Sequence, residues 1–111
     1  MIYVDYRIGS EHLLPLLDKM MLPTQLSEIN FGDVAFDGNG PDGKVRIGIE
    51  LKRIRDLVNS IRSGRLSGHQ LPGLTDRDNY HGCMLIVEGE YRPGAQGRLE
   101  IKRGYDWIVL E

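Results

Sequence analysis

The sequence lacks the features that mark secreted, membrane-spanning or nucleic-acid-coating proteins. It contains a single cysteine, so no internal disulfide can form, and an intracellular, reducing compartment is expected. No apolar run approaches the roughly 18 residues that span a bilayer, and no charged segment followed by an apolar block opens the chain. The net charge of −2 excludes a protein that coats nucleic acid through overall positive charge.

The composition is sufficient for one folded unit. Because 41% of the 111 residues are hydrophobic, the chain can bury a core without disulfides or a structural metal, and a single domain over residues 1–111 is expected. Its positive charge is unevenly distributed, since residues 44–65 carry a net charge of +5. Such a run is typically a solvated helix face, and a phosphate-binding surface is the alternative.

Alternating apolar and polar residues predict strands in the first half of the chain. In the segment 44–51, β-branched residues alternate with polar or small ones, as in a half-buried strand. The preceding segment 37–43 is dense in Gly, Asp, Asn and Pro and predicts a hairpin connection. Shorter β-prone segments predict three more strands, at residues 2–6, 25–29 and 33–37.

Helical spacing of apolar residues marks two segments. Leucines and methionines recur at this spacing over residues 11–21, with Ser10 as the expected N-cap and Pro15 in or near the first turn. From Arg53 onward, apolar residues stand at i, i+3, i+4 and i+7, which predicts an amphipathic helix that ends at Gly64.

The remaining segments are less regular. Residues 66–82 have no clear period and predict a loop, with one short helical turn at 69–71. The uniformly apolar run 83–87 predicts a central strand covered on both faces, in which Cys83 is a small buried thiol. Two further strands are predicted at 98–102 and 106–110. The whole order indicates an α/β fold, with a mixed sheet flanked by helices.

Asp33, Glu50 and Lys52 form a candidate hydrolytic site. Phosphodiester hydrolysis needs a cation, carboxylates that hold it and a group that orients or activates water. Glu50 and Lys52 lie two residues apart in a predicted strand, so their side chains share one face, and antiparallel pairing brings Asp33 beside Glu50. Two carboxylates with room for water favour Mg²⁺ or Mn²⁺ over zinc. A surface strand that carries a Glu–Lys pair is the alternative.

The residues around this site resemble the motifs of the XPF/Hef structure-specific nucleases, which belong to the PD-(D/E)xK class. Gly32 and Asp33, followed by residues 50–57, resemble the GD…ERKxxxD signature, and the sequence SIRSGRL resembles the SIxxGRL that follows it. VDYR near the N-terminus is similar to the opening VDxRE, Gln70 falls near the glutamine after GRL, and LIVEG matches a strand of the family. The resemblance covers residues 2 to about 91.

This resemblance implies a restriction-endonuclease-like fold with a defined set of site residues. Asp33 and Glu50 are expected to bind the metal, and Lys52 to help activate the water. Asp5 and Arg7, which match the opening motif, are expected to line the same cleft.

The sequence departs from the family pattern at three points. Leu51 stands in place of the usual arginine between the Glu and the Lys, and Ile8 stands where VDxRE has its glutamate. No tandem helix-hairpin-helix pattern follows residue 91, and in relatives this module supplies much of the grip on duplex DNA. Such a compact form is compatible with a small viral or bacterial nuclease.

Two functions of different classes follow from these residues. The first is a metal-dependent endonuclease that cuts flaps, forks or Holliday junctions in DNA repair, recombination or replication. The second is a non-catalytic DNA-binding or scaffolding partner in a nuclease heterodimer. The presence of Asp33, Glu50 and Lys52 together favours the first function.

The expected partners are branched or double-stranded DNA and a second copy of the chain. Four basic residues are candidates for contacts to backbone phosphates, because no recognition-helix motif is present: Arg53, Arg55, Arg62 and Arg65. A homodimer is also suggested by the resemblance and by apolar residues near the C-terminus. Met84, Ile86 and the segment 105–110 are candidates for core or interface.

Overall fold

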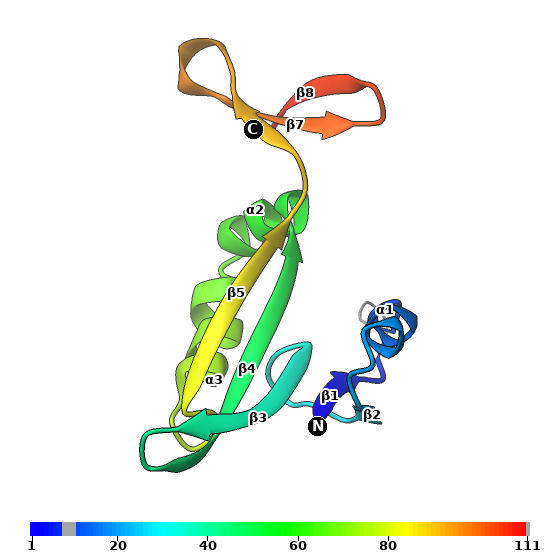
Figure 1. The fold of residues 1–111 in the computed structure, drawn as a ribbon. Coiled ribbons are helices and arrows are strands. Elements are labelled where there is room, and N and C mark those ends of the chain that lie inside the picture. Colours follow the sequence, from blue (N-terminus) through cyan, green and yellow to red (C-terminus); the bar gives the residue numbers. More distant parts are fainter. Residues whose placement is uncertain (8–10, 111) are drawn as a thin grey trace.

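A mixed five-stranded sheet is the main structural element of this protein (Figure 1). The structure, a computed structural model, describes residues 1–7 and 11–110. The sheet has the order β2-β1-β3-β4-β5, with parallel pairs at β1–β2 and β4–β5 and antiparallel pairs between the others. Its strands are β1 (Ile2–Asp5), β2 (Thr24–Ser27), β3 (Val34–Gly40), β4 (Gly43–Arg53) and β5 (Gly82–Glu88). The expected α/β fold with a mixed sheet is confirmed.

The longest strands of the first half form the predicted hairpin. Strands β3 and β4 pair from Val34 opposite Ile49 to Gly40 opposite Gly43, so the turn lies at Pro41 and Asp42. Both strands extend further into the turn-rich segment than the sequence suggested. This register matters for function, because it places Asp33, the residue before β3, at the level of Glu50 in β4.

Helices pack against both ends of the sheet. Helix α1 (Leu13–Lys19) is shorter than predicted, with Pro15 in its first turn as expected, whereas the proposed N-cap Ser10 lies outside the described residues. Helix α2 (Ile54–Arg62) follows β4 directly, as predicted, and packs against β4 and β5. No helix of the described residues is long and apolar enough to span a membrane.

The segment predicted to be a loop is partly helical. Leu66–Gln70 forms a π-helical turn, η1, and Leu71–Thr75 forms helix α3, which packs against β4 and β5. Leu66 and Leu74 are buried, so this segment contributes to the core. A π-helical turn bonds each residue to the fifth one before it and therefore interrupts the 3.6-residue period that reveals a helix in a sequence.

The hydrophobic core lies between the sheet and α3. It contains Ile29, Ala35, Leu74 and Tyr80, with Phe31 packed against them. The Tyr80 hydroxyl donates a hydrogen bond to the carbonyl oxygen of Phe31, which ties the loop before β5 to the segment before β3.

We expect Gly48→Ala to destabilise the protein. A Cβ at position 48 lies 2.6 Å from Cε2 of the Tyr80 ring, so either the ring or β4 must move. Overpacking of this kind costs about 1–3 kcal/mol. Urea unfolding followed by Tyr and Trp fluorescence measures the loss, and Gly68→Ala is the matched control because no atom lies within 4 Å of its added Cβ. Equal unfolding midpoints for Gly48→Ala and wild type would contradict the packing described for Tyr80.

Strand β5 differs from its prediction. It is an edge strand of the five-stranded sheet rather than a central one, and every residue from Cys83 to Glu88 is exposed. The expectation of a buried thiol at Cys83 is therefore wrong as well. An apolar run predicts that a strand packs against other apolar residues, but it does not specify which segment, or which chain, provides those residues.

The last strands form a separate three-stranded sheet in the order β6-β7-β8. Strands β7 (Leu99–Arg103) and β8 (Asp106–Leu110) match the prediction, whereas β6 (Tyr91–Pro93) was not predicted, because Pro93-Gly94 has the composition of a turn. The Arg92 guanidinium lies 4.2 Å from the centre of the Trp107 ring and pairs with Glu100 at 2.8 Å. Figure 1 shows this sheet beyond the end of β5, at one end of the molecule. The chain is thus a single α/β domain with a small second sheet.

Candidate active site

Asp33 and Glu50 lie side by side at the open end of the β3–β4 hairpin. The pairing of Val34 with Ile49 places Asp33, one residue before β3, at the level of Glu50 in β4. The backbone N–H of Asp33 donates to the Ile49 carbonyl at 2.7 Å, and the backbone N–H of Leu51 donates to Oδ2 of Asp33 at 2.7 Å. The predicted proximity of the two carboxylates is confirmed, and the β4 backbone fixes the position of one of them.

Gly32 allows this close approach. Its φ of +93° lies in the region that favours glycine, and a Cβ there would lie 3.1 Å from the Ile49 carbonyl oxygen and 3.3 Å from Cδ1 of Leu74. A side chain at this position would push the segment before β3 away from β4. A glycine is therefore required before Asp33 in the GD motif, because a larger residue would displace Asp33 from Glu50.

Lys52 shares a face of β4 with Glu50, as the two-residue spacing predicts. Its Nζ lies 3.6 Å from Oε1 of Glu50, and each of the two side chains is only 11% exposed. Lys52 also lines a pocket of about 270 Å³ together with Asp33 and Arg53. An ammonium group and two carboxylates are therefore brought to one place.

The environment of Glu50 disfavours its negative charge. Burial raises the pKa of Glu50 above its usual value, and the neighbouring Asp33 carboxylate raises it further, while Lys52 acts in the opposite direction. A divalent cation between the two carboxylates would neutralise this repulsion. The arrangement thus has the electrostatic character of a metal-binding site.

Asp5 and Arg7 join the same site through β1. The backbone N–H of Asp5 donates to the Asp33 carbonyl at 2.9 Å, and its side chain is buried. Nε of Arg7 donates to both carboxylate oxygens of Asp5, at 3.0 and 2.9 Å, and Nη2 donates to Oδ2 at 2.5 Å and to the Ile29 carbonyl. Burial would raise the pKa of Asp5, but these bonds from Arg7 outweigh it and hold the pKa below its usual value.

The Asp5–Arg7 pair lines a pocket of about 240 Å³ with Asp33 and Glu50, as the opening motif suggested. Because Arg7 already occupies the Asp5 carboxylate, this pair is better suited to shape the pocket than to bind a metal. Ile8, the third residue of interest in that motif, lies outside the described residues.

Part of the lining of this pocket comes from η1 and the residue before it. Arg65, His69 and Gln70 line the pocket together with Glu50, although they follow Glu50 by 15 to 20 positions. The His69 ring contacts Phe31, with ring centroids 5.4 Å apart. Residue spacing gave no sign of His69, while the glutamine after GRL was the only signal for Gln70.

The four candidate DNA-binding arginines are not equivalent. Arg53 lines the pocket of Asp33 and Lys52, and Arg65 lines the pocket of Glu50. Arg55 lies in the first turn of α2 and lines the adjacent groove beside Arg53, whereas Arg62 is exposed in the last turn of α2. Two of them therefore reach the candidate site and two lie beside it.

The donor set fits a hard divalent cation. In the described part of the chain, no three His, Cys, Asp or Glu side chains cluster as a metal cage. The two carboxylates of Asp33 and Glu50 instead suit Mg²⁺ or Mn²⁺, since Mg²⁺ usually keeps several waters and takes one or two protein carboxylates. The raised pKa of Glu50 agrees with such a site.

Comparison with known protein families identifies the class. The family model described as ERCC4 domain matches residues 4–107, and the chain therefore belongs to the ERCC4 domain family. Members of this family are generally DNA-binding nucleases of the structure-specific endonuclease type, with roles in DNA repair. A comparison with curated proteins found no significant match.

Proposed function

We propose that this protein is a Mg²⁺- or Mn²⁺-dependent endonuclease that hydrolyses phosphodiesters in branched DNA, such as flaps, forks or Holliday junctions. The observation that carries the proposal is the juxtaposition of Asp33 and Glu50 at the end of the β3–β4 hairpin, with Lys52 3.6 Å from Glu50. Membership of the ERCC4 domain family supports the same reaction class.

Each residue of the site has a part in this reaction. Asp33 and Glu50 would hold the metal, and Leu51 N–H keeps Asp33 in place. A bound Mg²⁺ or Mn²⁺ supplies positive charge for the phosphate that gains charge in the transition state. Lys52 orients and polarises the attacking water beside Glu50. Arg53 and Arg65 line the flanking pockets and place cations against the neighbouring phosphates.

Cleavage of defined DNA structures tests the proposal. The purified protein is incubated with labelled flap, fork and four-way substrates in Mg²⁺, in Mn²⁺ and in EDTA. Metal-dependent cuts at the branch are expected, and the product map gives the preferred structure. Binding without cleavage would instead support a non-catalytic partner of a nuclease heterodimer, and discrete bands from a plasmid digest would indicate a sequence-specific enzyme.

Arg55→Ala and Arg62→Ala should weaken the binding of all duplex sequences about equally. If each arginine contacts one phosphate, its loss lowers the salt slope of binding by roughly one unit and leaves cleavage at saturating DNA intact. Arg53→Ala should also lower the rate, because Arg53 lines the pocket of Asp33 and Lys52. Binding isotherms at several salt concentrations measure the slopes, with the exposed Arg77→Ala as control. Unchanged salt slopes for both α2 variants would show that the arginines of α2 form a solvated helix face and do not contact phosphates.

We also propose that β5 takes part in a homodimer. Met84 and Ile86 are 51% and 41% exposed, and β5 has a free edge in the five-stranded sheet. Exposed apolar side chains on a strand edge are typical of protein–protein contacts. A monomer mass by light scattering at all micromolar concentrations would reject the dimer, and a dimer that Met84→Lys dissociates would support it.

A further inference from the structure

A groove leads away from the candidate active site towards the second sheet. It has a volume of about 340 Å³ and is lined by four cations, one from the end of β4, one from the start of α2 and two from the end of β7: Arg53, Arg55, Lys102 and Arg103. Glu88 and Glu90 are the acidic residues that line it. The buried Ile101 and the half-buried Ile54 also contribute to its lining, from β7 and α2 respectively.

This groove adjoins the candidate active site. Arg53 and Glu88 line both the groove and the pocket that contains Asp33 and Lys52. The groove therefore extends from the neighbourhood of Asp33 and Lys52 to β7. The second sheet thus lies on a path that begins at the proposed chemistry.

Three of the four cations in the groove lack an ionic partner among the residues that the structure describes. Lys102 pairs with Glu90 at 3.2 Å, but Arg53, Arg55 and Arg103 form no ion pair with any residue of the described ranges. Three unpaired guanidinium groups in one groove suit the evenly spaced phosphates of a DNA backbone. The charge complementarity is local, because the chain as a whole has a net charge of −2.

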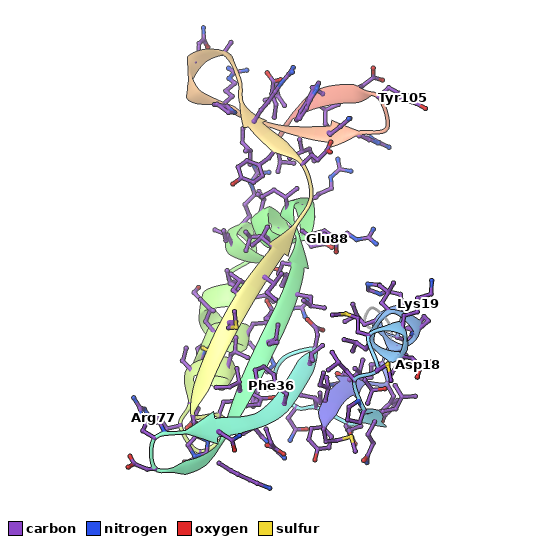
Figure 2. The ribbon with its side chains drawn as sticks, in the orientation of Figure 1. Asp18, Lys19, Phe36, Arg77, Glu88 and Tyr105 are labelled. Atoms are coloured by element: carbon purple, nitrogen blue, oxygen red, sulfur yellow. The ribbon has the colours of Figure 1, made fainter. Side chains whose placement is uncertain are left out.

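An exposed aromatic ring stands at the far end of this path. Arg103 pairs with Asp106 in the β7–β8 ladder, so Gly104 and Tyr105 form a two-residue hairpin turn, and the φ of +63° at Gly104 is the conformation that such a turn requires. Tyr105 is completely exposed and makes no packing contribution to the sheet. Figure 2 shows it at the tip of the β7–β8 hairpin, with Arg77 at the opposite end of the molecule.

We propose that the β6–β8 sheet is a second DNA-binding element, in which Arg103 contacts the backbone phosphates that leave the active site and Tyr105 stacks on an unpaired base. An aromatic side chain next to a cation is the combination by which proteins hold single-stranded nucleic acid. The inference rests on the proposed action on branched DNA, because a flap or a fork presents unpaired bases directly beside a duplex. On this proposal, the β6–β8 sheet recognises the branch in the DNA.

Binding to two DNAs tests this proposal. Anisotropy in EDTA compares a fork that has unpaired arms with a fully paired duplex of the same length. Tyr105→Ala should weaken fork binding about fivefold or more and duplex binding less than twofold, whereas Tyr105→Phe should bind as wild type. Arg103→Ala should lower the salt slope for both DNAs by about one unit. Arg77→Ala is the control for the loss of one exposed arginine.

A fluorescent base separates stacking from charge. With 2-aminopurine at the first unpaired position, wild type and Tyr105→Phe should quench the fluorescence and Tyr105→Ala should not. If Tyr105→Ala and Arg103→Ala behave as Arg77→Ala, or wild type binds neither DNA, the inference is overturned. If the protein cleaves the fork, and Tyr105→Ala and Arg103→Ala cleave and bind it as wild type does, this inference is overturned while the proposed nuclease activity stands. If fork binding depends on Tyr105 but no cleavage occurs, only the proposed nuclease activity is overturned.

Discussion

Asp33→Asn and Lys52→Ala are each expected to reduce the single-turnover rate of branched-DNA cleavage by about a thousandfold or more. Asp33 is one of two carboxylates that would hold the metal, and Lys52 is the cation that pairs with Glu50 in the described structure. Loss of a metal ligand or of the group that activates water removes several kcal/mol of transition-state stabilisation, and about 1.4 kcal/mol corresponds to a tenfold change in rate. The cleavage rate should therefore fall to the background of the assay.

The same two variants should keep the fold and most of the DNA binding. The asparagine side chain of Asp33→Asn retains an oxygen that can accept the bond from Leu51 N–H. Rates on a labelled flap at saturating protein, together with binding in EDTA, separate chemistry from affinity. Asp18→Asn and Lys19→Ala are matched controls, because both residues are exposed at the end of α1 (Figure 2) and line neither pocket of the site. Wild-type rates in both site variants would show that the chemistry lies elsewhere.

Glu50→Gln should abolish cleavage and yet stabilise the metal-free protein at neutral pH. Burial and the Asp33 charge raise the folded-state pKa of Glu50, so the folded protein disfavours its ionised form. The contribution of protonated Glu50 to the free energy of unfolding is fully present below its pKa in the unfolded chain, near 4.5. It is lost as the pH rises through the raised pKa of Glu50 in the folded protein. The glutamine of the variant carries no charge to bury, so its advantage should be absent at low pH and grow towards neutral pH.

Melting temperatures from pH 4 to pH 8 in EDTA measure this difference. Added Mg²⁺ should raise the melting temperature of the wild type more than that of Glu50→Gln, because a ligand that binds only the folded state stabilises it by about 2.7 kcal/mol at 100 times its Kd. Glu28→Gln, at an exposed position, is the control for removal of a carboxylate. A variant less stable than wild type at pH 8 would mean that the Lys52 pairing outweighs the burial and repulsion at this site.

Much of the candidate site was predictable because it is local in the sequence. The alternation in β4 gives the common face of Glu50 and Lys52, and the turn residues at 37–43 give the hairpin that brings Asp33 to Glu50. The GD…ExK pattern combines these two local signals. The period of a strand and the chemistry of a turn are properties of neighbouring residues, so they can be read without knowledge of the rest of the chain.

Other parts of the site come from segments whose sequence has no regular period. The π-helical turn carries His69 and Gln70 to the pocket of Glu50, but a single turn of this type leaves no repeating signal. The spacing of Asp5 and Arg7 allowed the two side chains to pair, and the structure shows this pair. The bond from Arg7 to the Ile29 carbonyl could not be predicted, because it depends on the packing of segments 22 residues apart.

Most of the strands and helices, the shared face of Glu50 and Lys52, and the reaction class that the motifs suggest could be predicted from residues close together in the chain. The position of β5 at an edge with its apolar residues exposed, and the second sheet beyond it, depend on long-range packing. The same is true of Arg53 and Arg103, which are 50 residues apart and line one groove. Local periodicity specifies which side chains avoid water, whereas the surface that covers them depends on contacts between segments far apart in the chain.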